Sequence, residues 1–395
     1  MKEIAIVGGG PAGSLCGERL ASAGFPVTLF EEHPAWEKPC GGGLTHKAIQ
    51  TYPFLLDNPL PKREVRSAEL ISGSGQRAKF DLGDPIVIYS RKVLNRMLLE
   101  RAKSAGCRVV ESRVTAVDTQ SPRVRLTTKN AKHDADFVVL AGGARNQLLP
   151  ETTPLRPQDL EITLGYFVPG QQESLKIKFL PQFEGYLWSF PRADHLSVGI
   201  CGKMAQNSSR KLRGHLDQFV REEGIPTEGA TFYSHVLPSP EVETIKHRRV
   251  AGRNWALAGD AAACTDPVTG EGLYYALRSG DLLAQALMEE SPETYPARLQ
   301  AELSADLEFA ARVARFLFRG QFLGAAVTTR MVQFLRRSAT FRELMRDVFS
   351  GSQNYTTLRR RLWKQLGATL AEIARSLFDP AAADPLAAVP PPQQP

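Results

Sequence analysis

The chain has 395 residues, of which 43% are hydrophobic and 23% are charged, and its formal net charge is +7. That length is too great for one ordinary hydrophobic core, so we expect several substructures, and no apolar run is long enough for a membrane-spanning helix. Five scattered cysteines without a Cys-x-x-Cys pair argue against a disulfide framework or a metal site, and the basic residues form no nucleic-acid-binding motif.

The first predicted elements are a strand, a helix and a second strand. The first strand begins at residue 4, which leaves no room for a signal peptide and predicts a cytoplasmic protein. Between strand and helix, Gly8, Gly10 and Gly13 form a G-x-G-x-x-G pattern. It allows a tight turn, close approach of a pyrophosphate and close helix packing. With Glu31 placed at the end of the second strand to bind ribose hydroxyls, the pattern predicts an adenine dinucleotide site, without separating FAD from NAD.

The next stretch alternates between loops, strands and helices. "EKPCGGGLTHKAIQTY" predicts a loop that leads into a helix with Thr45 as its cap. Residues 64–90 alternate like strands, and an amphipathic helix follows with Ser90 as its cap. Further strands end in the buried strand "ADFVVLAGG". We therefore assign residues 1–150 to the first part of a dinucleotide-binding domain, with a small strand insertion at about 64–90.

The pattern of residue types changes three times in the second half of the chain. Residues 151–245 contain strand-like runs between Pro, Gly and charged turns, which predicts a mostly antiparallel substrate domain. Residues 246–290 again show the pattern of the first domain, a buried strand followed by glycines. Residues 291–380 follow a helical pattern, and residues 381–395 are a Pro- and Ala-rich tail that we expect to be disordered. The predicted fold is α/β, with a Rossmann-type domain, a second mostly antiparallel sheet domain and a helical C-terminal extension.

A second glycine-rich loop, "GDAAACTDPVTGEGLYYALRSG", follows the last buried strand. Asp260, directly after that strand, is placed to bind a sugar-like hydroxyl chain such as the ribityl chain of FAD. Gly270 and Gly272 precede a helix whose N-terminal N–H groups and dipole favour negative charge, which a reduced flavin carries. This loop favours FAD over NAD.

Four stretches resemble a known family: "IVGGGPAG" with Glu31, "KPCGGGL", "YLWSFP" and the second glycine-rich loop. They are similar to FAD-dependent oxidoreductases of the p-hydroxybenzoate-hydroxylase fold, and within these to the geranylgeranyl reductase family, over residues 1–290. The resemblance implies that Arg91 contacts FAD and that the Val114 backbone contacts the adenine. The cofactor-binding residues that we expect are Gly8, Gly10, Pro11, Ala12, Gly13, Glu31, Gly41, Gly42, Arg91, Val114, Gly259, Asp260, Gly270 and Gly272.

The resemblance also implies reaction and substrate residues. In the family pattern the "CGGG" segment lies beside the flavin, where its glycines let the main chain approach a flat ring. Cys40 would then face the reaction space and tune the flavin or donate a proton; the alternative is a small buried apolar residue. Tyr186, Trp188 and Phe190 alternate on one strand face, where they either fill a sheet core or line the cavity for an apolar substrate.

Some positions depart from related families. Aromatic hydroxylases of this fold carry an Asp that serves FAD and NADPH where this chain has Gly142, so the electron donor is either NADPH or a small carrier such as ferredoxin. Flavin-dependent halogenases carry a related Trp-x-Trp-x-Ile-Pro motif, whereas this chain has Tyr186 and Phe190 at the first and third of these positions.

The basic, aromatic C-terminal helices leave two interpretations open. They either pack on the core with a solvated basic face, or they contact an anionic membrane surface or an acidic electron-carrier protein. We expect a monomer or weak oligomer. Three functions follow: reduction of carbon–carbon double bonds in a hydrophobic, isoprenoid-like substrate with hydride from flavin N5; flavin-dependent oxygenation or halogenation of a secondary metabolite; or electron transfer to quinone.

Overall fold

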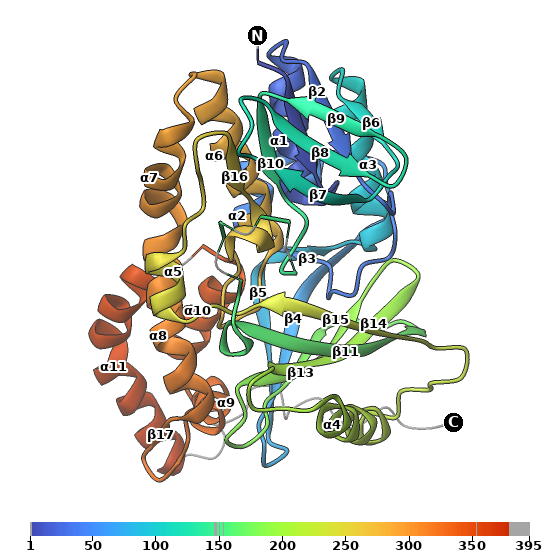
Figure 1. Cartoon of the computed structure of the whole chain (residues 1–395). Helices are drawn as coiled ribbons and strands as arrows, with labels where there is room; N and C mark the ends of the chain where they lie inside the picture. The colour runs from blue at the N-terminus through green and yellow to red at the C-terminus, as the bar shows by residue number, and fades with distance from the viewer. Residues whose placement is uncertain (1, 146–147, 150, 153, 353, 379–395) are drawn as a thin grey trace.

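The computed structural model describes residues 2–145, 148–149, 151–152, 154–352 and 354–378. A five-stranded parallel sheet has the strand order β16-β10-β1-β2-β6 (Figure 1). The apolar runs of β1, β10 and β16 are buried along their whole length, as expected for strands covered on both faces. The strands are β1 (Ile4–Val7), β2 (Val27–Phe30), β6 (Arg108–Val110), β10 (Phe137–Leu140) and β16 (Trp255–Leu257).

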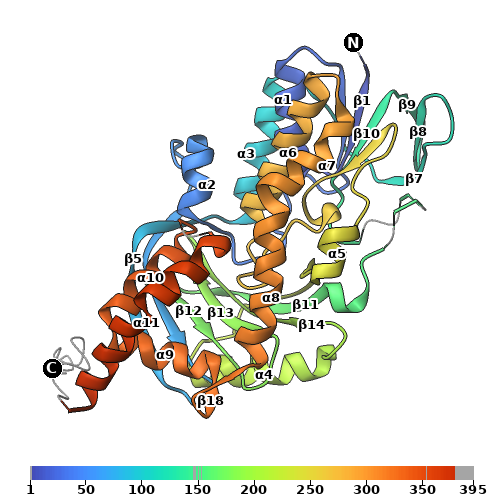
Figure 2. The same ribbon diagram turned by 90° about the vertical axis from the view of Figure 1, so that its left-hand side faces the viewer.

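Helices and a small second sheet cover the two faces of this parallel sheet (Figure 2). The helices are α1 (Pro11–Ser22), α3 (Arg91–Ser104) and α6 (Leu273–Met288), and the three-stranded antiparallel sheet contains β7 (Val114–Asp118), β8 (Val124–Thr128) and β9 (Lys132–Ala135). Small residues allow α1 and α6 to pack closely, because a Cβ on Gly280 would overlap the carbonyl oxygen of Ala12.

An eight-stranded sheet forms the second body of the molecule, with the order β15-β11-β14-β13-β12-β4-β5-β3. Its pairs are antiparallel except for β12 with β4, which is parallel. The strands are β3 (Gly43–Leu44), β4 (Arg63–Ile71), β5 (Arg77–Ile88), β11 (Leu160–Pro169), β12 (Leu175–Lys178), β13 (Gly185–Pro191), β14 (His195–Lys203) and β15 (Thr231–Pro238).

This sheet includes the strand insertion predicted at about 64–90. The insertion forms β4 and β5, which pair with β12 and β3 in the eight-stranded sheet. The alternating pattern specifies a strand and its buried face, but it does not specify which distant strand becomes its partner. The predicted α/β class, with a Rossmann-type sheet, a second mostly antiparallel sheet and C-terminal helices, is confirmed.

Two sets of helices cover the eight-stranded sheet. Helix α4 (Ser209–Glu222) packs on one face, and the C-terminal helices α8 to α10 pack on the other, where their apolar residues join those of β4 and β5 (Figure 2). The predicted tail at 381–395 lies outside the described residues.

The remaining helices are α2 (His46–Thr51), α5 (Val242–His247), α7 (Tyr295–Leu299), α8 (Ala305–Arg319), α9 (Val327–Arg337), α10 (Ala339–Phe349) and α11 (Tyr355–Phe378). A hairpin between α8 and α9 consists of β17 (Gln321–Phe322) and β18 (Ala325–Ala326).

None of the described helices is both long enough and apolar enough to span a bilayer. Across the same residues, His, Cys, Asp and Glu side chains form no group of three that could hold a metal ion.

Candidate active site

One cavity of about 1160 Å³ begins at the carboxyl ends of the parallel strands and extends between the eight-stranded sheet and the C-terminal helices. Because parallel strands end at the same edge, segments far apart in the sequence meet there: Gly8 after β1, Glu31 after β2 and Asp260 after β16. The aromatic residues of β13 and the inner faces of α8 to α11 line the rest of the cavity.

The first glycine loop has a separate reason for each of its three glycines. Gly8 has a φ of +104°, and a Cβ there would lie 2.5 Å from the carbonyl oxygen of Ala141. A Cβ on Gly13 would overlap the Gly8 carbonyl oxygen, whereas a Cβ on Gly10 would meet nothing within 4 Å. The protein itself therefore leaves the space at Gly10 free, as a pyrophosphate site requires.

The start of α1 offers hydrogen-bond donors to this space. Gly10 is the N-cap residue of α1 and Pro11 the first helical residue, and no described side chain caps the helix. Together with Ala12, these residues line the cavity. Arg91 also lines it, is 4% exposed, and has an Nε atom without a hydrogen-bond partner. An open helix N-terminus and a buried, partly unpaired guanidinium fit the phosphates of FAD.

Glu31 and Val114 differ in how they relate to the cavity. The Glu31 carboxylate lies at the cavity edge and accepts hydrogen bonds from the Gly9 N–H at 2.7 Å and the His33 N–H at 2.9 Å. These bonds fix the carboxylate beside the first loop, where a ribose would lie. Val114 begins β7, is 5% exposed, and is not among the residues that line the cavity. Its contact with adenine stays a prediction.

Asp260 forms an ion pair that joins the second loop to the segment before Cys40. Lys38 Nζ lies 3.2 Å from Asp260 Oδ2. Burial would raise the pKa of Asp260, but the charge and hydrogen bond of Lys38 act together with the Arg91 guanidinium and lower that pKa. Burial, reinforced by Lys38, lowers the pKa of His235 to about 3, so this neighbouring ring is neutral at pH 7. Asp260 is therefore ionised, with lone pairs available to the hydroxyls of a ribityl chain.

Three glycines shape the second loop. Gly259 and Gly270 have φ values of +63° and +70°, which only glycine adopts at little cost. A Cβ on Gly270 would lie 2.8 Å from the Tyr186 hydroxyl oxygen, so this loop touches the aromatic strand. Gly272 is the N-cap residue of α6, and no described side chain caps that helix. The α6 N-terminus is open to the cavity, as a negatively charged ring would require.

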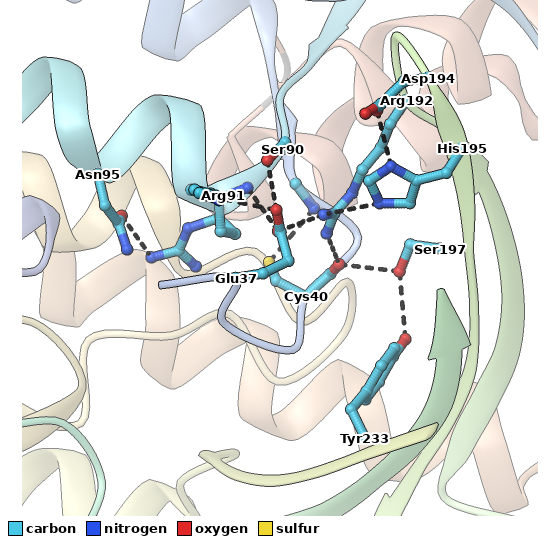
Figure 3. Close-up of polar contacts among 12 residues, drawn as sticks. Glu37, Cys40, Ser90, Arg91, Asn95, Arg192, Asp194, His195, Ser197 and Tyr233 are labelled. Carbon is cyan, nitrogen blue, oxygen red and sulfur yellow. Dashed lines mark hydrogen bonds and ion pairs between the residues drawn. The ribbon is translucent and has the colours of Figure 1, made fainter. Parts of the chain in front are cut away.

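Figure 3 shows how the Cys40 segment is held. The Cys40 carbonyl oxygen accepts hydrogen bonds from Arg192 Nη2 at 2.5 Å and from Ser197 Oγ at 2.9 Å. Ser197 in turn lies 3.1 Å from the Tyr233 hydroxyl. Arg192, whose side chain is fully buried, also forms an ion pair with Glu37. Two strands of the eight-stranded sheet thereby fix a loop that leaves the parallel sheet.

Glu37 caps helix α3 from outside the helix. Its carboxylate accepts hydrogen bonds from the backbone N–H of Arg91 at 2.7 Å and of Lys92 at 3.4 Å, and from the Ser90 hydroxyl. The predicted N-cap residues Ser90 and Thr45 do occupy the N-cap positions, but neither caps through its side chain. Instead, Thr45 Oγ1 donates to Glu271 at 2.7 Å, so both hydroxyls join separate segments of the site.

The Cys40 thiol lines the cavity in a positive environment. Burial would raise its pKa, but the Arg91 guanidinium, the Gly42 N–H and Arg192 together lower it. The Gly42 N–H lies 3.3 Å from Cys40 Sγ. The pKa values of three other cysteines, Cys16, Cys107 and Cys264, are raised by burial, the first of them most. Cys40 is thus set apart from the buried, chemically inert thiols.

The glycines after Cys40 also satisfy the packing of the protein itself. A Cβ on Gly41 would lie 2.5 Å from the Phe190 ring, and one on Gly42, whose φ is +84°, would overlap the Tyr89 carbonyl oxygen. From the sequence, these glycines are expected because they let the main chain approach a flat ring. The structure adds a second cause, because the loop must also fit between β5 and β13.

The aromatic residues of β13 share one wall of the cavity. Tyr186, Trp188 and Phe190 all line it, as strand alternation predicts, and the Tyr186 and Trp188 ring centroids are 6.1 Å apart. The Tyr186 hydroxyl donates a hydrogen bond to the Thr269 carbonyl of the second loop. Tyr186 and Phe190 also pack against the core beneath the C-terminal helices. The contact of these aromatic residues with a substrate stays a prediction.

The C-terminal helices supply the wall that the sequence analysis did not assign to the site. Apolar residues from α8, α9, α10 and α11 line the cavity, among them Leu317, Met331, Met345 and Leu366. Helix α11 is also tied to the second loop, because the Tyr355 hydroxyl donates to Asp266 Oδ2 at 2.7 Å.

Several supporting residues were missed by sequence reasoning: Glu37, Arg192, Ser197, Tyr233 and Glu271. Arg192 carried a usable signal, since it directly follows the aromatic strand, where a buried arginine needs a partner. The others have partners more than 30 residues away in the chain, and no local pattern identifies these.

A family model described as pyridine nucleotide-disulphide oxidoreductase matches residues 2–165. A geranylgeranyl diphosphate reductase from Synechocystis sp. is 30% identical over 335 residues, which cover 76% of this chain and 78% of the relative.

Two solved structures share the fold over most of this chain. A geranylgeranyl bacteriochlorophyll reductase-like protein from Thermoplasma acidophilum has a TM-score of 0.75 at 20% identity and covers 92% of this chain and 98% of its own. A flavin-dependent brominase has a TM-score of 0.67 at 17% identity, with coverages of 92% and 98%. At such low identities these two likenesses establish the fold and not the reaction.

Proposed function

The chain belongs to the geranylgeranyl reductase family of FAD-dependent oxidoreductases, and from this premise we propose that it reduces carbon–carbon double bonds of a hydrophobic, isoprenoid-like substrate. The observation that carries the proposal is the continuity of the cavity from the two glycine loops, past Cys40, to an apolar end lined by four helices. An extended apolar chain buried there gains ~25 cal/mol per Å² of apolar surface removed from water.

FAD, when bound, supplies the hydride from N5 of its reduced ring. The residues that would hold it are those that surround the open space at the carboxyl edge of the parallel sheet: Gly8, Gly10, Pro11, Ala12, Gly13, Glu31, Gly41, Gly42, Arg91, Gly259, Asp260, Gly270 and Gly272. All but Gly13 line the cavity, and Gly13 permits the turn of the first loop.

We propose Cys40 as the proton donor. Saturating a double bond consumes one hydride and one proton, and the proton must reach the second carbon. The pKa of the thiol is lowered by Arg91, the Gly42 N–H and Arg192, which makes it a better acid near neutral pH. Arg192 and Ser197 hold the Cys40 backbone, so the position of Sγ is fixed by groups that themselves do not line the cavity.

The source of electrons is either NADPH or a small electron carrier. Gly142, two residues after β10, stands where related hydroxylases carry an Asp, and it offers no side chain to a nicotinamide cofactor. This favours a carrier protein as the donor.

The test uses purified holoprotein reduced with dithionite without oxygen. An isoprenoid diphosphate is then added anaerobically, the return of the oxidised-flavin absorbance is followed, and the product is analysed by mass spectrometry. We expect rapid reoxidation and a product heavier by two hydrogens. Absence of anaerobic reoxidation, with a hydroxylated or halogenated product formed only in air, would instead favour the oxygenase or halogenase function.

A quinone in place of the isoprenoid tests the third function. Rapid anaerobic reoxidation by the quinone alone, with no saturated isoprenoid product, would assign the protein to electron transfer. A protein that retains no flavin after reconstitution would contradict all three functions.

A further inference from the structure

Exposed large apolar side chains gather at the end of the molecule farthest from the parallel sheet. The elements that carry them are α8, α11 and the β17–β18 hairpin, and α9 contacts all three (Figure 2). We call this surface the C-terminal mouth. It contains Phe316, Phe322, Leu323, Leu362 and Trp363, which are 56%, 37%, 62%, 40% and 71% exposed.

The C-terminal mouth opens into the active-site cavity. Four of these exposed side chains also line the cavity: Phe316, Phe322, Leu362 and Trp363. An apolar chain can therefore pass from outside this surface to the aromatic strand β13 along a continuous apolar wall. Three other large apolar residues are exposed on the described surface. Leu370 is on α11, whereas Trp36 and Phe232 belong to other elements.

The hairpin tip holds an apolar side chain outward at a conformational cost. Leu323 has a φ of +50°, a left-handed conformation that is unfavourable for a branched side chain, and Gly324 follows with +73°. Arg330 fixes this turn, because its guanidinium donates to the carbonyl oxygens of Phe322 and Leu323. A strained turn that exposes a leucine 62% in water is stabilised when that leucine enters an apolar phase.

Basic residues surround the mouth. Residues 305–378 contain 13 basic and 5 acidic residues, so this segment accounts for the positive charge of the whole chain. Arg359, Arg360 and Lys364 flank Leu362 and Trp363 on α11, and Arg315 adjoins Phe316 on α8. All four are exposed and form no ion pair with the described residues.

We propose that the C-terminal mouth docks on the surface of an anionic lipid bilayer, with Leu323 and Trp363 inserted among the acyl chains and the basic residues at the headgroups. Aromatic and leucine side chains next to unpaired cations match the apolar interior and charged boundary of such a bilayer. An acidic carrier protein would satisfy the charges but would leave the protruding Leu323 and Trp363 without an apolar phase.

The docking itself stands on this surface alone. That lipid chains then enter the cavity from the bilayer rests on the proposed function. The two can be separated, because vesicle binding is measured on the oxidised holoprotein without substrate.

The test is co-sedimentation of the full chain with vesicles of phosphatidylcholine alone and of phosphatidylcholine and phosphatidylglycerol in equal parts. We expect binding to the anionic vesicles only, weakened by added salt. The variants Leu323→Ser and Trp363→Ala should each lower the affinity on the order of tenfold, since each removes a buried apolar group. Arg360→Gln with Lys364→Gln should lower it on the order of fivefold per charge.

Matched controls are Phe232→Ser, an exposed aromatic on β15 outside the cavity, and Arg210→Gln, an exposed basic residue on α4. Both should bind like the wild type, and unchanged flavin absorbance verifies that every variant folds. Full binding by the mouth variants, or no binding to either vesicle, would overturn the proposal. Two other results would also overturn the proposal, provided that vesicles fail to bind. One is a dimer that the mouth variants abolish, and the other is a complex with an acidic carrier protein that these variants abolish. Vesicle binding without double-bond reduction would leave the docking intact and remove the proposed function.

Discussion

The two ends of the cavity differ in the atoms that line them and in how tightly those atoms are held. At the parallel-sheet end, backbone atoms lie so close together that single Cβ atoms at Gly8 and Gly13 are excluded, and the Cys40 carbonyl oxygen is held by two hydrogen bonds. At the helical end, the wall consists of flexible apolar side chains such as Met331 and Met345. The comparison teaches that the parallel-sheet end, where we place the cofactor, requires particular atoms at particular positions. The helical end, where we place the substrate, requires mainly volume and an apolar lining.

The largest effect is expected at Cys40, where the two ends meet. In a Cys40→Ala variant the proposed proton donor is lost, and turnover should fall by about 10²- to 10⁴-fold. Flavin content should stay the same, because the carbonyl that holds the loop is unaltered. Single-turnover reoxidation of the reduced protein by substrate measures the effect. Unchanged turnover would exclude Cys40 from the reaction, and Cys107→Ala, in a buried thiol that does not line the cavity and whose pKa burial raises, is the control.

The next largest effect is expected at Arg192, which fixes the Cys40 loop from behind. Arg192→Met removes the cation beside Glu37 and a donor to the Cys40 carbonyl, and it should cost about 3 kcal/mol of unfolding free energy. Arg192→Lys keeps the charge and should recover part of this loss. Denaturant unfolding measures both. Because Arg192 helps to lower the Cys40 pKa, the acidic thiol should also titrate at higher pH in Arg192→Met, and an unshifted pH profile would argue against that coupling.

The glycines of the first loop separate folding from cofactor binding. Gly13→Ala places a Cβ on the Gly8 carbonyl oxygen and should cost about 1–3 kcal/mol of stability. Gly10→Ala meets no protein atom within 4 Å, so it should keep the stability of the apoprotein and lower only the affinity for FAD. Thermal unfolding of the apoproteins and flavin titration provide the two readouts. Equal losses of stability in both variants would contradict the assignment of Gly10 to the cofactor.

Stability should depend on pH through Glu271 at the cofactor end. Burial raises the pKa of this carboxyl from 4.5 to about 7. The folded state therefore binds more protons than the unfolded state between these values, and its stability falls as the pH rises from 4.5 to 7, by on the order of 2 kcal/mol. Glu271→Gln should remove that decline and leave stability near pH 4 unchanged. Denaturant midpoints across this pH range measure it, and parallel curves for both proteins would contradict the shift.

The smallest effect is expected at the helical end. Met345→Leu conserves volume in the cavity wall and should change stability by less than about 1.5 kcal/mol. Because this apolar side chain lines the cavity and offers no polar group to the reaction, KM for the substrate should change more than kcat. Steady-state kinetics with matched flavin content tests this. A large loss of kcat with unchanged KM would mean that the two ends are not as different as the structure indicates.

The cofactor end was largely predictable because its signals are local. The spacing of Gly8, Gly10 and Gly13 between a strand and a helix, and Asp260 directly after another strand, identify two loops without any tertiary information. Alternation also placed Tyr186, Trp188 and Phe190 on one wall. The roles of the individual residues toward FAD and substrate stay predictions.

The supporting contacts were not predictable, since their partners are distant in the chain. Ser90 and Thr45 have the composition of helix caps, and they occupy cap positions, yet their hydroxyls bond to Glu37 and Glu271. Likewise β4 and β5 have the pattern of strands, but that pattern does not identify the eight-stranded sheet that they join. Local propensity identifies an element, while long-range packing selects its partners.

The sequence by itself determined the fold class and the two cofactor loops, because the glycine spacings and strand-terminal acids follow from local backbone geometry, and the resemblance of four stretches indicated the family. Only the tertiary structure decided that Arg192 fixes the Cys40 loop and that the basic C-terminal helices line the cavity and open it to the exterior. A helix with both apolar and basic faces is compatible with either a core or an interface, and the choice depends on what the rest of the chain packs against it.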